Sequence, residues 1–266
     1  MKNLLLKIKK EYKNTNKLIA TIHILLRIFV IISIIISAIN RNWYNVFCLS
    51  VVAIGFMLPY FFKNTFKVEI PSALELVIVL FIFASIFLGE MNSFYEKVPN
   101  YDTYLHLING FISCAIGYSI GNILNINYKS FQLNRIFNVI FAICFTTTIG
   151  VLWEFMEFGF DNSHFRTDMQ KDRIITNISS VDLNKEKINK AIKINDIYET
   201  VIYYDEDKKL TIQNGYLDIG LYDTMKDLKM NFIGSLVFAF ALILNKKDSK
   251  KYKVANEFII KKEKTT

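Results

Sequence analysis

The chain has 266 residues, of which 52% are hydrophobic and 15% aromatic, and it carries a net charge of +8 at a mean hydropathy of +0.27. A soluble domain of this length is usually less apolar, so the composition argues against a soluble globular protein. A positive charge can indicate nucleic-acid binding. Here the lysines gather at both ends of the chain, which is typical of residues that orient membrane helices, and no nucleic acid is expected as a partner.

Six apolar segments, each about 20 residues long, follow one another along the chain, and this length crosses a hydrocarbon core of about 30 Å. The first is too long for the apolar part of a cleavable signal peptide and is expected to act as a signal anchor. The predicted fold class is an all-α membrane protein, a bundle of about six transmembrane helices with a small extracytoplasmic mixed α/β insert. We place the segments at 18–39, 43–62, 70–89, 103–124, 135–158 and 224–244.

Lysine and arginine in short loops mark the cytoplasmic face of a membrane protein. With six spans both lysine-rich ends lie on that face, which predicts a multi-pass protein of the plasma (inner) membrane with cytoplasmic N- and C-termini. The predicted parts are a basic cytoplasmic N-terminus (1–17), transmembrane helices one to five (18–158), an extracytoplasmic insert (159–222), transmembrane helix six (223–244) and a basic cytoplasmic tail (245–266).

The 159–222 insert is polar and too small to form a large core alone, so we expect it to rest on the membrane domain. Residues 180–192 are predicted as a short helix capped by Ser180. The apolar runs 200–204 and 210–213 flank a charged turn and are predicted to pair as a hairpin.

Six ionisable residues lie at the ends of three apolar segments, and the predicted topology brings all of them to the outer side of the membrane. Within each segment the two are three or four residues apart and therefore share one helix face. Ionisable groups at membrane depth are costly unless they face the bundle interior. The six candidate metal ligands are Asp102, His106, Glu154, Glu157, Asp223 and Asp227.

Carboxylates with one imidazole suit a divalent cation such as Mg²⁺, Mn²⁺ or Zn²⁺. His106, Glu154 and Glu157 are the candidate catalytic residues, because an imidazole or a carboxylate can act as general base. There are also structural alternatives. Asp102 and Asp223 are favoured residue types for helix N-caps, the two glutamates can reach the interface from a helix end, and His106 can be a hydrogen-bonded packing residue.

Other residues inside the spans have simpler interpretations. Arg27 and Glu75 fall in the cytoplasmic half of the first and third segments, where they either form a buried ion pair or leave Arg27 reaching to the inner surface. His23 matches no motif. Gly110, Gly117 and Gly121 recur along the fourth segment, where small residues allow helices to approach closely in lipid.

The stretches 101–110, 153–158 and 218–227 together resemble the YjdF-type family of small bacterial inner-membrane proteins, and the likeness extends over roughly 70–240. A more distant resemblance to VanZ-like proteins includes the run Asp227-Leu-Lys-Met-Asn231-Phe-Ile-Gly234, while Glu157 and the long insert depart from that pattern. The YjdF-type resemblance implies a membrane fold that carries these polar residues, and it implies no particular reaction.

Three classes of function fit these features. The first is a metal-dependent hydrolase or transferase that acts on a lipid-linked or envelope substrate at the outer face. The second is an ion- or proton-coupled carrier. Two observations argue against a carrier: no charged residues continue into the cytoplasmic half of spans four to six, and inverted repeats are not evident. The third is a non-catalytic protein whose polar cluster holds three helices together. The lipid bilayer is a partner in each case, and no oligomeric state is indicated.

Overall fold

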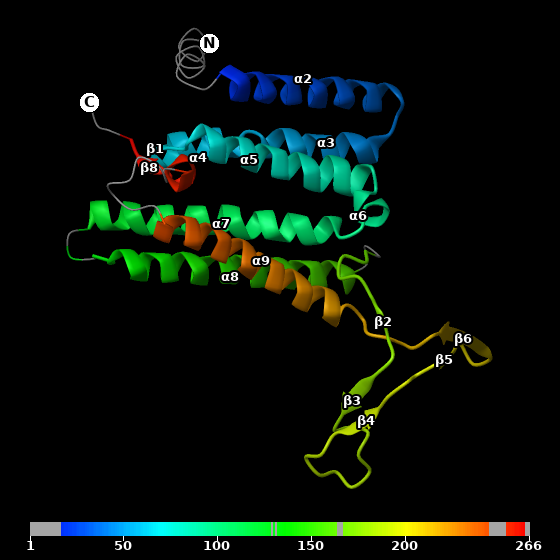
Figure 1. Cartoon of the computed structure of the whole chain (residues 1–266). Coiled ribbons are helices and arrows are strands. Elements are labelled where there is room, and N and C mark those ends of the chain that lie inside the picture. Colours follow the sequence, from blue (N-terminus) through cyan, green and yellow to red (C-terminus); the bar gives the residue numbers. More distant parts are fainter. Residues whose placement is uncertain (1–16, 129, 131, 164–166, 245–253, 264–266) are drawn as a thin grey trace. The chain divides into compact units, whose positions relative to one another are not determined.

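The computed structural model describes residues 17–128, 130, 132–163, 167–244 and 254–263 (Figure 1). The predicted all-α membrane fold is confirmed, since the described residues include six helical segments that are long and apolar enough to cross a membrane. These are Lys17–Ile39, Trp43–Phe66, Ser72–Met91, Tyr101–Asn127, Arg135–Asp161 and Leu221–Leu244. Most of the predicted N-terminal part (1–17), and 245–253 and 264–266 of the predicted tail, lie outside the described residues.

The chain divides into two compact units. The first consists of Met1–Gly150 with Lys229–Thr266, and the second of Val151–Leu228. Two helices, α8 (Arg135–Asp161) and α9 (Leu221–Leu244), each contribute residues to both units. The candidate residues are accordingly found in two groups, one in each unit.

The first unit begins with α2 (Lys17–Ile39), which packs against α3 (Trp43–Gly55) and α5 (Ser72–Ile82). The second span is not one helix, because it breaks after α3 and resumes as α4 (Leu58–Phe66). Pro59 explains the break, since its nitrogen has no hydrogen to donate and its ring crowds the preceding turn. The third span continues from α5 as a π-helix, η1 (Phe83–Met91), and a short α6 (Phe94–Lys97) follows.

The last three spans supply the rest of the first unit, with α7 (Tyr101–Asn127) packed against α5. Glycines allow α9 to approach α7 closely. A Cβ atom at Gly110 would overlap the carbonyl oxygen of Asn231, and one at Gly234 would overlap the carbonyl oxygen of Leu107. The packing role expected for glycine on the fourth span is therefore observed for Gly110, and such contacts are characteristic of helices packed in lipid.

The described end of the chain folds back onto this unit. A 3₁₀ turn, η2 (Val254–Phe258), is followed by β8 (Lys261–Lys262), which pairs antiparallel with β1 (Val68–Glu69). The Phe258 ring packs edge-on against Phe111, with ring centroids 5.0 Å apart. The backbone N–H of Ile260 donates to Ser119 Oγ at 2.9 Å. This part of the predicted basic tail is thus an integral element of the first unit.

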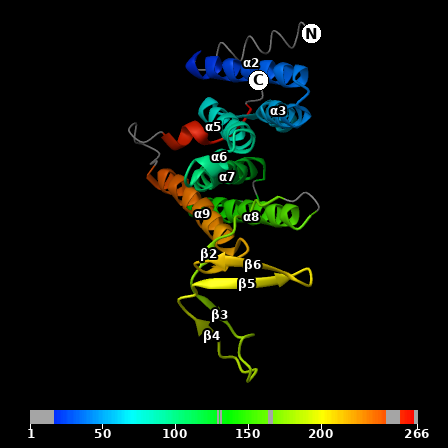
Figure 2. The ribbon, with the colours of Figure 1, turned by 90° about the vertical axis from the view of Figure 1, so that its right-hand side faces the viewer.

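The second unit contains three two-stranded ladders in addition to the ends of α8 and α9 (Figure 2). The predicted hairpin is confirmed. Its strands β5 and β6 pair antiparallel, with Thr200 opposite Ile212 and Tyr204 opposite Lys208. The strands of this unit are β2 (Ile174–Ile175), β3 (Ile178–Ser180), β4 (Ile192–Ile194), β5 (Glu199–Tyr204), β6 (Lys208–Gln213) and β7 (Tyr216–Leu217), which pair as β2–β7, β3–β4 and β5–β6.

The predicted helix over 180–192 is wrong. Ser180 ends β3 instead of capping a helix, and its Oγ accepts the N–H of Asp182 in a turn. Asn184 then closes the loop, because its side chain accepts the N–H of Glu186 and donates to the carbonyl of Lys190. Asparagine side chains that bond nearby backbone groups favour turns over helices, and a short isolated helix is costly to nucleate.

Candidate functional site

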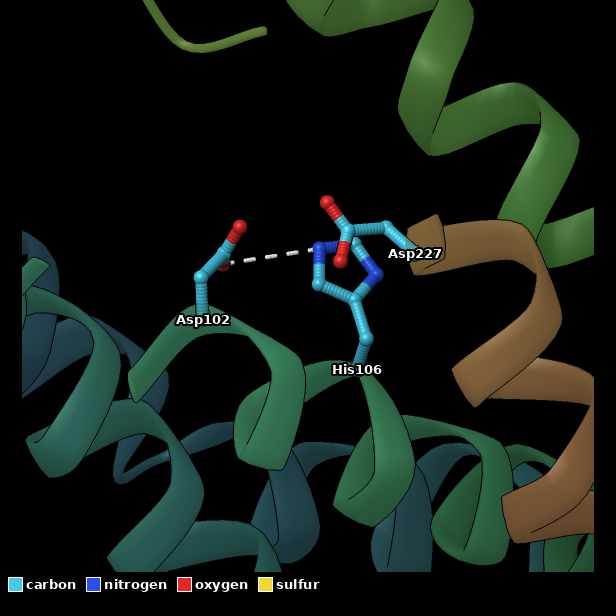
Figure 3. A group of neighbouring side chains, drawn as sticks. All are labelled: Asp102, His106 and Asp227. Atoms are coloured by element: carbon cyan, nitrogen blue, oxygen red, sulfur yellow. Dashed lines mark ion pairs between the residues drawn. The ribbon is translucent and has the colours of Figure 1, made fainter. Parts of the chain in front are cut away.

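Asp102 and His106 form a pair on the first turns of α7, where the structure confirms that they share a face (Figure 3). His106 Nε2 lies 3.5 Å from Asp102 Oδ1, and the two side chains are 7% and 21% exposed. The helix begins at Tyr101 after Asn100 at the N-cap, so Asp102 lies inside the first turn and the N-cap alternative for it is wrong. The carboxylate therefore orients the imidazole.

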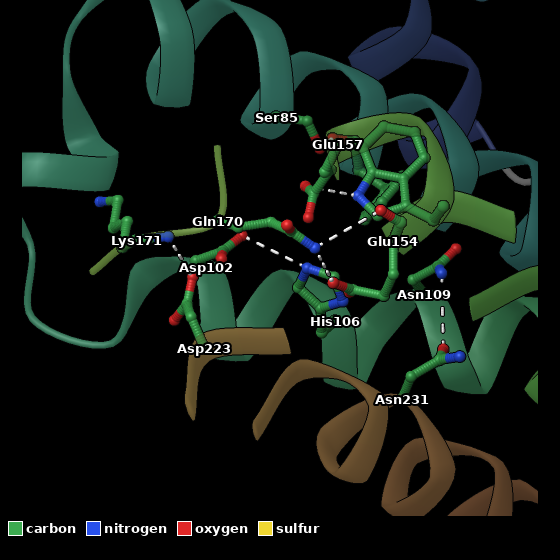
Figure 4. Close-up of polar contacts among 12 residues, drawn as sticks. Ser85, Asp102, His106, Asn109, Glu154, Glu157, Gln170, Lys171, Asp223 and Asn231 are labelled. Carbon is green, nitrogen blue, oxygen red and sulfur yellow. Dashed lines mark hydrogen bonds and ion pairs between the residues drawn. The ribbon is translucent and has the colours of Figure 1, made fainter. Parts of the chain in front are cut away.

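A layer of amides lies next along α7 in the first unit. Asn109 Nδ2 donates to Asn231 Oδ1 of α9 at 3.4 Å (Figure 4). Asn231 Nδ2 donates to the carbonyl of Thr146 on α8 at 3.2 Å. Asn231 is 1% exposed. One side chain thus links three helices through hydrogen bonds, as polar residues commonly do in membrane bundles.

Glu154 belongs to the second unit, where it lies near the end of α8 and is 4% exposed. The side-chain amide of Gln170 donates to Glu154 Oε2 at 3.4 Å and to Thr224 Oγ1 of α9 at 2.7 Å (Figure 4). The loop that carries Gln170 is itself fixed by Asp161, whose carboxylate accepts the backbone N–H groups of Met169 and Gln170, both at 2.8 Å. Gln170 therefore connects α8 to α9 by hydrogen bonds, and its partner on α8 is Glu154, a candidate general base.

Glu157 and Asp223 are also held within the second unit. Glu157 Oε1 accepts the indole N–H of Trp153 at 2.7 Å, and Asp223 Oδ2 accepts the backbone N–H of Lys171 at 3.0 Å. The two carboxylates belong to residues only 7% and 6% exposed. Such burial rules out the alternative in which the glutamates reach the interface. Asp223 is the third residue of α9, so it is not an N-cap either.

Asp227 completes the predicted set, and it is 1% exposed on α9. It shares a helix face with Asp223 before it and Asn231 after it, as the four-residue spacing predicts.

Among the predicted site residues, the structure pairs Asp102 with His106 directly, and it connects Glu154 and Asp223 to the adjacent loop residues Gln170 and Lys171. Gln170 carried no signal in the sequence, because it lies in a loop whose residues match no motif.

Asp218, just before α9, has a structural role, because its carboxylate binds the backbone of the adjacent loops. Its carboxylate accepts the backbone N–H groups of Arg173 (2.6 Å), Tyr222 (2.8 Å) and Gly220 (3.3 Å). Burial acts to raise the pKa of Asp218, but these donors and the charge of Arg173 outweigh it and hold the pKa below its usual value. Burial and the nearby carboxylates of Asp168, Asp218 and Asp161 raise the pKa of Asp172.

The Asp218→Asn variant is expected to destabilise the second unit by roughly 1–2 kcal/mol at neutral pH, because it weakens hydrogen bonds to a charged acceptor. A carboxyl group with a lowered folded pKa stabilises above its unfolded value of about 3.9, and the effect is lost as the pH falls through the folded value. Hydrogen exchange at the amides of Arg173 and Tyr222 should be faster in the variant at pH 7, and the difference should shrink in acid. Asp205→Asn, in the exposed hairpin turn, is the control. A difference that persists undiminished in acid would contradict the charge-based account.

Comparisons with known proteins agree with the membrane architecture. A family model described as "Predicted membrane protein (DUF2238)" matches residues 22–183. An uncharacterized protein of Thermotoga maritima is 28% identical over 109 residues, which are 41% of this chain and 54% of that protein, so the chain spans about half of that relative's length. No solved structure matches the chain. The matched family range contains Asp102, His106, Glu154 and Glu157, and it ends before α9.

Proposed function

We propose that this chain, which belongs to the family of predicted membrane proteins described as DUF2238, binds a divalent cation on the side of the membrane opposite its termini. The observation that carries the proposal is the Asp102–His106 pair, a nearly buried imidazole beside a carboxylate on a membrane-spanning helix. Intramembrane groups of this kind are rare and mark functional sites. The lysine distribution favours the plasma membrane with both termini cytoplasmic, which would put the cation at the outer face.

Asp227 is the third ligand that we propose. Asn231 of α9 meets Asn109 of α7, and α9 is one continuous helix from Leu221 to Leu244. Asp227 lies about one turn before Asn231 on the same face of this helix, which supports its choice as a ligand.

Two carboxylates with one imidazole fit Mn²⁺ or Zn²⁺, and they fit Mg²⁺ with water completing its shell. A bound cation supplies a Lewis acid that polarises a phosphoryl or carbonyl oxygen, or lowers the pKa of a water molecule. Glu154 is our candidate for the general base, since Gln170, which also bonds Thr224, donates to it and fixes its orientation. We infer a hydrolase or transferase for lipid-linked or envelope substrates, because such substrates are accessible to a site at the membrane surface.

A structural role is the second candidate, and a specific observation favours it. Asn231 links α7, α8 and α9 by hydrogen bonds, and it lies on the same stripe as Asp227. In this alternative the carboxylates extend the same interhelical network, and the protein acts through its shape or its partners.

Metal analysis by mass spectrometry of detergent-purified protein separates the two candidates. The first predicts a near-stoichiometric divalent metal in the wild type and its loss in Asp227→Asn, with an unchanged elution profile on size exclusion. The matched control is Asp207→Asn in the exposed hairpin turn, which should keep the metal. Wild-type protein that stays metal-free after reloading with Mn²⁺ and Zn²⁺ would reject the cation site. An Asp227→Asn variant that loses its fold, from a metal-free wild type, would establish the structural alternative.

A further inference from the structure

Three ionisable residues that play no part in the cation proposal lie inside the first three spans. His23 and Arg27 are on α2, and Glu75 is on α5, which packs against α2. At 1.5 Å per residue, Glu75 lies about 5 Å, His23 about 9 Å and Arg27 about 15 Å from the start of its own helix. Since each span crosses the membrane, α2 and α5 begin on the same side of it. Glu75, His23 and Arg27 therefore lie at increasing depth from that surface toward the middle of the membrane.

His23 is the buried member of this group. It is 8% exposed, and its Nδ1 lies 3.8 Å from Glu75 Oε1. Its Nε2 is buried and has no hydrogen-bond partner among the described residues. A buried polar nitrogen without a partner is costly. An imidazole placed beside a carboxylate but otherwise unsatisfied can reduce that cost by taking up a proton and pairing with the carboxylate.

Arg27 adds a fixed positive charge one helical turn further along α2. Its guanidinium donates to the carbonyl of Phe56 at 3.4 Å. This carbonyl lies where the second span is interrupted between α3 and α4, so the break is anchored by the arginine. Arginine remains protonated in proteins, and its charge opposes protonation of a nearby imidazole while Glu75 favours it.

We propose that His23 and Glu75 form a proton-binding site accessible from the side of the membrane on which α2 begins. A proton from water on that side binds the imidazole, and the carboxylate stabilises the resulting cation. A buried apolar cluster, Val30, Leu49, Val52, Phe56 and Val79, begins at the level of Arg27. Val30, Leu49 and Val52 continue it toward the other side, and we infer that they close the route, so that the proton is exchanged with one surface only.

The other titratable groups of the neighbouring helices are few. Tyr44 and Cys48 lie in the first half of α3, where Tyr44 donates to Glu90 of η1 at the opposite end of the third span. Tyr60 and Lys63 lie on α4. Glu75 is therefore the carboxylate that pairs with His23. The proton site is independent of the cation site, since it shares no residue with it.

Nitrogen-15 NMR of histidine-labelled protein in detergent micelles tests the proposal. The chain has three histidines, and the His23→Gln variant identifies the signal of His23. The His23 ring should change from the neutral to the protonated form between about pH 8 and about pH 5, the range in which histidine commonly titrates. Glu75→Gln should move the midpoint of this change to lower pH by about one unit.

Arg27→Gln should move the midpoint in the opposite direction, and it provides the same test if Glu75→Gln does not fold. Glu69→Gln, an exposed carboxylate in β1, is the matched control and should leave the midpoint unchanged. An imidazole that stays neutral throughout this range in folded protein would overturn the proposal. A midpoint that neither variant moves would overturn it as well.

Discussion

Replacing Gly110 with alanine is expected to destabilise the helix bundle by about 3 kcal/mol, the upper end for overpacking a well-packed interior. The added methyl group would overlap the carbonyl oxygen of Asn231, which is backbone and cannot rotate away. The two helices would have to separate, and the Asn109–Asn231 bond would be lost with the contact. Thermal unfolding in detergent, followed by size exclusion, should show a much lower midpoint than for the wild type.

Gly159→Ala is the matched control for this experiment. Gly159 also lies in a helix, α8, and a Cβ atom there would meet nothing within 4 Å. Alanine has the higher helix propensity, so this variant should be as stable as the wild type or slightly more stable. Equal stability of Gly110→Ala and Gly159→Ala would show that α7 and α9 do not approach as closely as the structure indicates.

The Phe258→Ala variant is expected to release the C-terminal segment 254–263 from the first unit. The Phe258 ring packs edge-on against Phe111 and Phe238, and the same segment is anchored by Ile260 and β8. Truncation of a packed phenylalanine costs about 3 kcal/mol. We do not expect the two strand pairs and the hydrogen bonds of Ile260 and Lys262 to offset this, so the segment should detach while the six spans stay folded.

Limited proteolysis of detergent-purified protein measures this release, because lysines at 261 and 262 become cleavable by trypsin when β8 leaves β1. Val254→Ala is the control, since Val254 lies in the same turn and is 69% exposed. The control should be cut at the wild-type rate and Phe258→Ala at least ten times faster, which corresponds to about 1.4 kcal/mol. Equal rates would mean that the Phe258 contacts do not hold the segment.

The spans and the hairpin were predictable because their signals are local. An apolar run of sufficient length identifies a span, and alternating apolar residues around a charged turn identify β5 and β6. The break in the second span carried a signal in Pro59, yet the hydrophobic run continues through it. The prediction of a helix over 180–192 is wrong because the side chain of Asn184 stabilises a turn there. A pattern of apolar residues does not reveal such a turn.

The candidate site was predictable only in part. Spacing of three or four residues correctly paired Asp102 with His106 and placed Asn231 on the stripe of Asp227, because helical periodicity fixes which residues share a face. Periodicity contains no information about loops, so Gln170 was missed although it bonds both Glu154 and Thr224. His23 was missed for a related reason: its contact with Glu75 joins residues of two different spans.

The pairing of β8 with β1 has a consequence for biosynthesis. Residues 68–69 emerge from the ribosome long before 261–262, so the connection between α4 and α5 has no strand partner until residues 261–262 have been synthesised. The same holds for Ser119, whose hydroxyl receives the N–H of Ile260. The first unit is thus completed only once residues 254–263 have been synthesised, and a chain that terminates before them leaves an open strand edge and an uncovered phenylalanine surface. Such surfaces are recognised by chaperones and proteases, which would let the cell discriminate copies that contain this segment from copies that lack it.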